Sequence, residues 1–143
     1  MGSYTWSHSY GNYEGYVNSD IGQDDAGITQ TFDFAGLSDN SYGFLPNDRR
    51  HNFKVFGAYA FDFGLQVGAN AWYRTGRPIN AFGVHPTDPW AEQYGVFSFF
   101  NQGVACPRGC QGTTDDSYAL DLNVKYDFTL AGLNMNVRMD VFN

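Results

Sequence analysis

Cys106 and Cys110 are the only two cysteines in the chain, and Pro107, Arg108 and Gly109 separate them. Two thiols this close, with proline and glycine between them, can close a small disulfide ring. Metal binding is the competing chemistry, but two thiols without a nearby histidine make a poor metal site. The spacing therefore favours a disulfide, which implies an oxidising compartment and serves to stiffen a loop, with no metal or cofactor bound.

Charged residues gather in two short motifs that invite a search for acid–base or anion-binding chemistry. Residues 48–51 read Asp-Arg-Arg-His, but no serine or cysteine nucleophile lies in a recognisable turn. An electrostatic network is therefore favoured over a catalytic His–Asp pair, and we predict no enzymatic activity. Arg77 lies in a Thr-Gly-Arg-Pro motif, where it faces either an anionic ligand or, as the favoured alternative, an aspartate.

Two further segments carry residues that could bind a ligand. Residues 11–48 hold seven carboxylates and no lysine or arginine, without the spacing of a calcium loop. The favoured interpretation is a solvated segment, and the alternative is capture of a divalent cation or a positively charged ligand. Because like charges repel, we expect this segment to be mobile or held by cations or partner loops. The aromatic residues of a later segment could either stack on a substrate or pack that loop against itself: Trp90, Tyr94, Phe97, Phe99 and Phe100.

The elements that must position these residues are β-strands. Residues 51–63, 65–73, 118–128 and 133–141 alternate apolar and polar side chains, and residues 3–10 form a weaker fifth segment. Strands of about 9–11 residues are long enough to cross a bilayer at a tilt. Tight turns near 61–64 and 129–132 alternate with long segments at about 11–49 and 76–116. Such alternation is typical of outer-membrane barrels, with short periplasmic turns and long extracellular loops that have little regular structure.

Aromatic residues on the apolar faces lie at the strand ends, and aliphatic or small residues lie between them. Tyr59, Phe61 and Tyr126 are near the short turns, whereas Tyr73 and Tyr118 are near the long segments. Two aromatic belts around an aliphatic band match a bilayer, while a soluble core has no reason to sort aromatics by height. The predicted fold is all-β: an antiparallel meander of about five long strands, part of a transmembrane β-barrel. Its polar lumen would be lined by Lys54, Gln66, Asn70, Arg74, Asp121, Asn123, Lys125, Asn136, Arg138 and Asp140.

Composition excludes several other classes of protein. The chain has 143 residues, a formal net charge of −7, 16% charged residues and 18% aromatic residues. This mix argues against disorder and against a helical bundle, and the acidic balance argues against a nucleic-acid partner. No apolar run is long enough for a membrane helix, and no signal peptide follows Met1. Either the protein stays inside the cell or its true start lies upstream.

Three motifs resemble the C-terminal barrel of TonB-dependent outer-membrane receptors, especially the Oar-like group. They are Asp-Arg-Arg-His at 48–51 followed by Phe53-Lys54, Gly-Arg-Pro at 76–78, and Met-Asp-Val-Phe-Asn at 139–143. The resemblance implies a Gram-negative outer membrane, a small nutrient ligand captured by the outer loops, and energy from the TonB complex. It also implies that residues 1–143 are part of a barrel, without the plug domain that contacts TonB. The ligand candidates are Lys54, Arg74, Arg77, Trp90, Tyr94, Asp121, Lys125 and Arg138.

Two alternatives remain open from the sequence. One is a secreted soluble β-sandwich that binds carbohydrate through loop aromatics, and the other is a passive porin or adhesin-type barrel. Five strands cannot close around a lumen, because the smallest such barrels use about eight. We therefore expect an open, curved sheet with two unpaired edges, and no stable insertion or transport by this piece alone.

Overall fold

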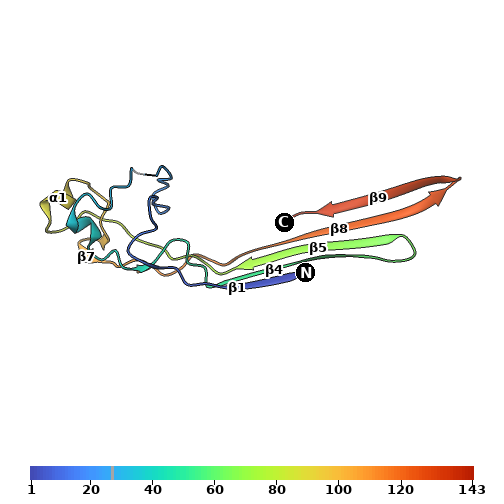
Figure 1. The fold of residues 1–143 in the computed structure, drawn as a ribbon, viewed down its shortest axis with the longest axis horizontal. Coiled ribbons are helices and arrows are strands. Elements are labelled where there is room, and N and C mark those ends of the chain that lie inside the picture. The colour runs from blue at the N-terminus through green and yellow to red at the C-terminus, as the bar shows by residue number, and fades with distance from the viewer. Residues whose placement is uncertain (27) are drawn as a thin grey trace. The chain divides into compact units, whose positions relative to one another are not determined.

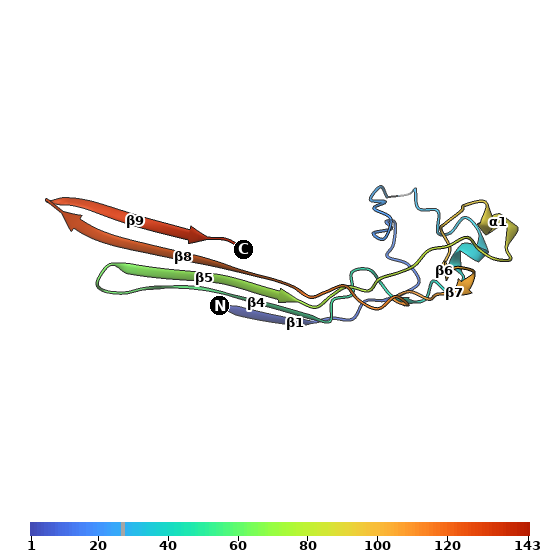
Figure 2. The same cartoon turned by 180° about the vertical axis from the view of Figure 1, so that it is seen from behind.

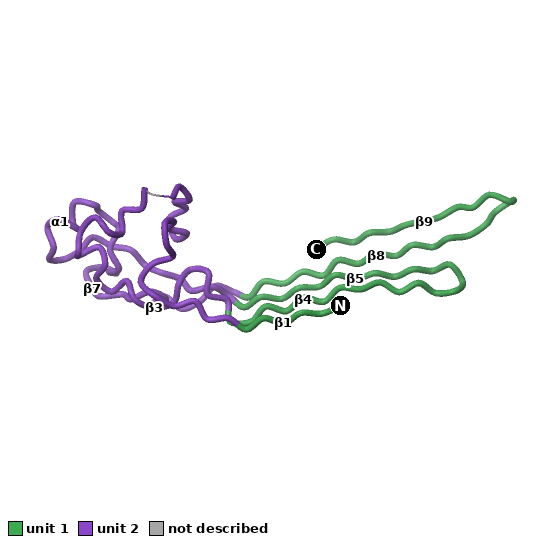
Figure 3. The backbone as a smooth tube through the Cα atoms, in the orientation of Figure 1, with its two compact units in different colours: residues 1–6, 50–75, 116–143 green, residues 7–49, 76–115 purple. Residues whose placement is uncertain are grey.

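The computed structural model describes residues 1–26 and 28–143, which form two compact units (Figure 3). We call residues 1–6, 50–75 and 116–143 the sheet unit, and residues 7–49 and 76–115 the loop unit. The two segments of the loop unit follow closely the two long loops expected from the sequence. The sheet unit takes its sequence from three separate stretches, so the strands pair across long intervening segments.

One antiparallel sheet of five strands makes up the sheet unit (Figures 1 and 2). Its strands lie in chain order, each hydrogen-bonded to the next, and the sheet is open with the first and last strands at its edges. The predicted five-stranded antiparallel sheet is thus confirmed. The strands are β1 (Gly2–Trp6), β4 (His51–Ala60), β5 (Leu65–Arg74), β8 (Ser117–Leu130) and β9 (Leu133–Val141).

The strand ends differ from the sequence prediction by more than one residue at three places. β1 ends at Trp6, and Tyr10 instead belongs to β2 (Tyr10–Gly11) of the loop unit. β4 ends at Ala60, because the turn that follows it closes with the Phe61 amide donating to the Leu65 carbonyl. β8 runs on to Leu130, because the next turn needs only two residues. These are Ala131 and Gly132, with φ of 51° and 80°, the positive values that a tight two-residue hairpin requires.

The strand register sorts the side chains into rows that cross the sheet. One row joins Tyr4, Phe53, Tyr73 and Tyr118, each opposite the next. Within this row the rings of Tyr4 and Phe53 stack with centroids 4.5 Å apart. The next rows on the same face are aliphatic or small, and aromatic rings return near the hairpin turns, where Tyr126 lies opposite Leu65 and Val137. The sheet therefore has one apolar face with an aromatic row toward each end.

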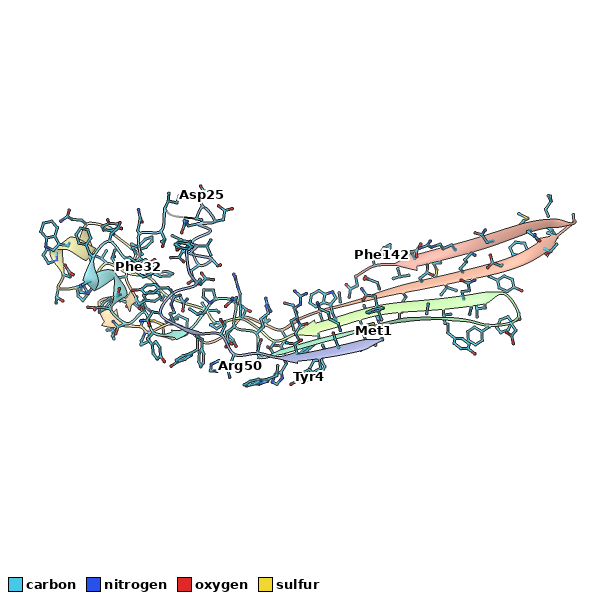
Figure 4. The ribbon with its side chains drawn as sticks, in the orientation of Figure 1. Met1, Tyr4, Asp25, Phe32, Arg50 and Phe142 are labelled. Carbon is cyan, nitrogen blue, oxygen red and sulfur yellow. A yellow bond between two sulfur atoms is a disulfide. The ribbon has the colours of Figure 1, made fainter. Side chains whose placement is uncertain are left out.

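No residue of the sheet unit, all of which the structure describes, is buried. Side chains project from both sides of the strands (Figure 4), and large apolar ones such as Leu122 and Val137 are 43% and 62% exposed. The buried apolar residues of the described chain lie instead in the loop unit: Leu37, Ala91, Phe99, Phe100 and Cys106. The apolar face of the sheet is thus left without a cover from its own unit.

The loop unit is more regular than the sequence prediction of loops with little structure. It contains β2 paired with β3 (Gly43–Phe44) and β6 (Phe100–Asn101) paired with β7 (Val104–Ala105). A short 3-10 helix η1 (Ala35–Ser38) contacts the single-turn helix α1 (Pro89–Glu92). Asp88 caps α1, because its Oδ1 accepts hydrogen bonds from the amides of Trp90 and Ala91 at 2.9 and 3.4 Å.

Candidate functional site

The polar face of the sheet holds five of the eight residues that the sequence analysis named as ligand candidates. The even-numbered residues of β5 project from this face. Arg74 is one of them, and each of the other four predicted residues lies in a row of cross-strand partners that contains one. The strand register therefore places on one face residues that are up to 84 positions apart, between 54 and 138. The five residues are Lys54, Arg74, Asp121, Lys125 and Arg138.

Hydrogen bonds and ion pairs link most of the charges on this polar face. Arg138 binds Asp140 through two nitrogens, Nε–Oδ2 at 2.8 Å and Nη2–Oδ1 at 3.0 Å. The Lys125 ammonium lies 2.8 Å from Oδ1 of Asp127, and Asp121 accepts from the side-chain amide of Asn70 at 3.0 Å. These contacts join neighbouring side chains into a polar surface suited to water and polar solutes.

Two cations of this face lack a carboxylate partner among the residues that the structure describes. Lys54 is exposed. The guanidinium of Arg74 lies over the ring of Trp72, 4.9 Å from its centroid, and the Arg74 Nε has no hydrogen-bond partner. Because both residues lie in the part of the face nearest the aromatic row of Tyr4, they form a positive patch at that end of the sheet.

Arg77, the candidate for an anionic ligand, belongs to the loop unit and is exposed. Its backbone is fixed by Thr114, whose Oγ1 accepts from the Arg77 amide at 3.0 Å. No carboxylate pairs with its side chain among the described residues, so the favoured pairing with an aspartate is not seen. Arg77 instead lines a pocket of about 310 Å³ together with Asp20, Asn80 and Phe82.

The Asp-Arg-Arg-His motif does not assemble a catalytic pair. Asp48 belongs to the loop unit, where its Oδ1 accepts from the amide of Ser9 at 2.7 Å. His51 belongs to the sheet unit, where its Nδ1 is 2.9 Å from the hydroxyl of Tyr4 and its amide donates to Thr75. Both residues therefore have structural partners at the strand ends.

Arg108 is a buried side chain of the loop unit that contacts several other residues, and sequence reasoning did not select it. Its Nη1 lies 3.2 Å from Oδ2 of Asp20, its Nε donates to the Asn12 carbonyl at 2.9 Å, and its guanidinium lies over the ring of Phe99. Burial lowers the pKa of Arg108 and raises that of Asp20, although each charge partly opposes the shift of the other. The only sequence signal was its place between the two cysteines.

The cysteines pair as a disulfide, with Cα atoms 5.4 Å apart. The ring presents Arg108 toward residues 12–20 and the Gly109 amide toward Asn80, whose Oδ1 accepts at 2.6 Å. Gly109 has a φ of +80°, a conformation that residues with a Cβ rarely adopt. The disulfide therefore fixes the backbone from which Arg108 reaches its partners.

A buried histidine, also missed by the sequence analysis, joins the two segments of the loop unit. Nδ1 of His85 accepts from the amide of Asp88 at 2.8 Å, so Nε2 carries the proton and donates to Oδ2 of Asp39 at 3.1 Å. Among residues 1–26 and 28–143, no group of three histidine, cysteine or carboxylate side chains is placed to hold a metal ion.

Trp90 and Tyr94 each lie beside Phe34, which comes from the other segment of the loop unit. The ring centroids are 5.8 Å apart for Phe34 and Trp90 and 5.6 Å apart for Phe34 and Tyr94. Phe97 adjoins Tyr94, whereas Phe99 and Phe100 are buried elsewhere in the unit. The structure thus separates the exposed Trp90 and the partly exposed Tyr94 and Phe97 from two buried rings that pack the loop, Phe99 and Phe100.

The sequence of the chain is similar to that of a known transporter. The chain is 35% identical, over 99% of its length, to the TonB-dependent transporter Oar of Myxococcus xanthus, and it spans 13% of the length of that protein. No protein-family model and no solved structure matches the chain. In the described residues, no helix has both the length and the apolar character needed to cross a membrane. The chain is therefore similar, along nearly all of its length, to a short stretch of a TonB-dependent transporter.

Proposed function

We propose that the chain forms part of an outer-membrane active-transport receptor of the TonB-dependent kind. The sheet unit is a section of the barrel wall, and the loop unit is the extracellular part that captures a small nutrient ligand. The polar face lines the barrel lumen, along which the ligand passes with energy supplied through TonB. The TonB contact belongs to a plug region outside residues 1–143.

The apolar face of the sheet carries this proposal. It has no cover from its own unit, and its aromatic rows lie toward both ends of the strands. Tyr118 and Phe128 on β8 are ten residues apart. This separation rises about 34 Å along a strand and about 26 Å across a membrane at a tilt of ~40°, close to the ~25 Å apolar band of such barrels. A β-sandwich would instead bury this face against a second sheet.

Fractionation of cells that express the full-length protein tests the location. We expect the protein in the outer-membrane fraction, resistant to extraction by alkaline carbonate, because the apolar face is held by lipid. Recovery from the periplasm or the culture medium would contradict the proposal. A second assay tests the energy source: the full-length receptor should bind the purified periplasmic domain of TonB, and absence of binding would favour a passive barrel.

A further inference from the structure

A group of three rings, two of them exposed and the third partly exposed, lies at the contact between η1 and α1 in the loop unit. Phe34 directly precedes η1, Trp90 is part of α1, and Tyr94 follows α1. The planes of Phe34 and Trp90 are within 19° of each other, and Tyr94 meets Phe34 edge-on at 71°. Trp90 is 59% exposed and Phe34 36%. We call these three residues the aromatic platform.

The backbone under the aromatic platform is held firmly. Leu37 of η1 and Ala91 of α1 are buried, and the Asp88 cap fixes the first turn of α1. Gly36 packs so tightly on the Asp88 side chain that a Cβ at position 36 would collide with it. The rings are therefore presented on a fixed backbone without being needed to fill the core. Such preorganisation reduces the entropy that a binding site loses on capturing a ligand.

A carboxylate adjoins the platform. The hydroxyl of Tyr94 donates to Oδ2 of Asp33 at 2.7 Å, and this hydrogen bond raises the pKa of Tyr94. Asp33 is exposed, and no lysine, arginine or histidine pairs with it in the part of the chain that the structure describes. One oxygen of Asp33 thus orients Tyr94, while the other remains available to a ligand beside the rings.

The net charge of the loop unit indicates which class of ligand the aromatic platform would bind. The unit contains ten carboxylates and three arginines, so it carries the whole formal charge of −7 and the sheet unit is neutral. A field of this sign attracts cations and repels anions. A cation over an aromatic face is stabilised by the ring quadrupole, and the chain already makes such a contact where Arg108 lies over Phe99.

We infer that the aromatic platform and Asp33 form a binding site for an organic cation, an alkylammonium or guanidinium group of the captured ligand. This inference rests on the proposed function, because it names the ligand class that the outer loops recognise. The cation lies over Trp90 and Phe34, and its N–H groups donate to the available oxygen of Asp33. A neutral sugar could also stack on these rings, but it would gain nothing from the acidic surroundings.

Binding of two matched peptides to the full-length protein in detergent tests the inference. Tetra-arginine amide carries the cation, and tetra-citrulline amide has nearly the same shape without the side-chain charge. We expect tetra-arginine to bind more tightly and its affinity to fall as salt is added. Trp90→Ala and Asp33→Asn should each weaken it by about threefold or more, the range of a cation–π or exposed charge contact. Trp90→Phe should retain most of the binding.

Asp115→Asn is the matched control, because it removes the same charge from an exposed residue of the same unit. Equal losses in Asp33→Asn and Asp115→Asn would show only general attraction to an acidic surface and would overturn the site. So would absence of tetra-arginine binding, equal binding of tetra-citrulline, or tighter binding of maltohexaose that Trp90→Ala abolishes. Fractionation separates the two claims: a protein in the outer membrane that fails these tests disproves the cation site alone.

Discussion

Arg108 and Asp20, 88 residues apart in the sequence, form an ion pair whose side chains are 3% and 11% exposed, respectively. This pair explains why the acidic segment can fold despite its charge. Three of the seven carboxylates of this segment accept hydrogen bonds from the other segment of the loop unit: Asp20 from Asn80 and Arg108, Asp33 from Tyr94, and Asp39 from His85. From the sequence, residues 11–48 are expected to be mobile or held by cations or partner loops. In the structure, the other segment of the loop unit supplies these contacts.

Replacing Arg108 should open the loop unit. In Arg108→Gln, Asp20 keeps its burial but loses its cation, and breaking one partner of a buried pair typically costs about 3–5 kcal/mol. We expect residues 11–48 of the full-length protein to become sensitive to protease and to lose protection in hydrogen exchange. Arg77→Gln is the control, since Arg77 is exposed and should change stability by less than about 0.5 kcal/mol. Equal protection of residues 11–48 in the two variants would show that the Arg108–Asp20 pair does not stabilise this segment.

The pKa of Asp20 gives the loop unit a defined pH dependence. Burial raises this pKa above its ordinary value of 3.8, so the folded unit binds the Asp20 proton more tightly than the unfolded chain does. Between 3.8 and the raised pKa, the Asp20 contribution to stability therefore falls as pH rises. Asp20→Asn should remove this contribution from the pH dependence of the free energy of opening, measured by hydrogen exchange. An unchanged slope in the variant would contradict the assignment.

The disulfide should stabilise the loop unit by a modest amount. A ring of five residues removes about 2 kcal/mol of chain entropy from the open state, and it also fixes the position of Arg108. Mass spectrometry of the unreduced protein from outer membranes should show no free thiol at Cys106 or Cys110. Cys106→Ser with Cys110→Ser should increase the rate at which protease cuts residues 11–48. Two free thiols in the native protein, or equal cutting rates, would contradict this role.

A charge on the apolar face should harm the barrel more than the same charge on the polar face. Leu122 lies between the aromatic rows, where arginine at the bilayer midplane costs about 2–4 kcal/mol. Its neighbour Asn123 projects from the opposite face, and arginine there keeps a donor beside Asp140. We expect Leu122→Arg to lower the amount of full-length receptor assembled in outer membranes and Asn123→Arg to leave it nearly unchanged. Equal losses would mean that the two faces meet similar surroundings.

The sequence predicted the parts of the fold that depend on local pattern. β9 has the predicted bounds and β5 differs by one residue, because the alternation of side chains continues along each whole strand. β1 was predicted too long, since residues 7–10 also alternate although the chain has left the sheet. The Arg108–Asp20 pair could not be foreseen, because nothing local links residues 88 positions apart. For the same reason Trp90 and Tyr94 were selected as aromatic candidates, while their neighbours Phe34 and Asp33 were not.

The accessibility of spin labels along β8 tests the central claim, that one face of the sheet meets lipid, most directly. Cys106 and Cys110 are locked in a disulfide and do not react with the label. Single cysteines are introduced and labelled in place of Leu120, Leu122 and Val124 on the apolar face and of Ala119 and Asn123 on the polar face. In the full-length receptor in lipid bilayers, oxygen, which concentrates in hydrocarbon, should relax the first three labels more strongly than a water-soluble nickel complex does. The other two labels should show the opposite preference. Uniform accessibility along the strand, or an alternation of the opposite sense, would contradict the membrane-barrel account.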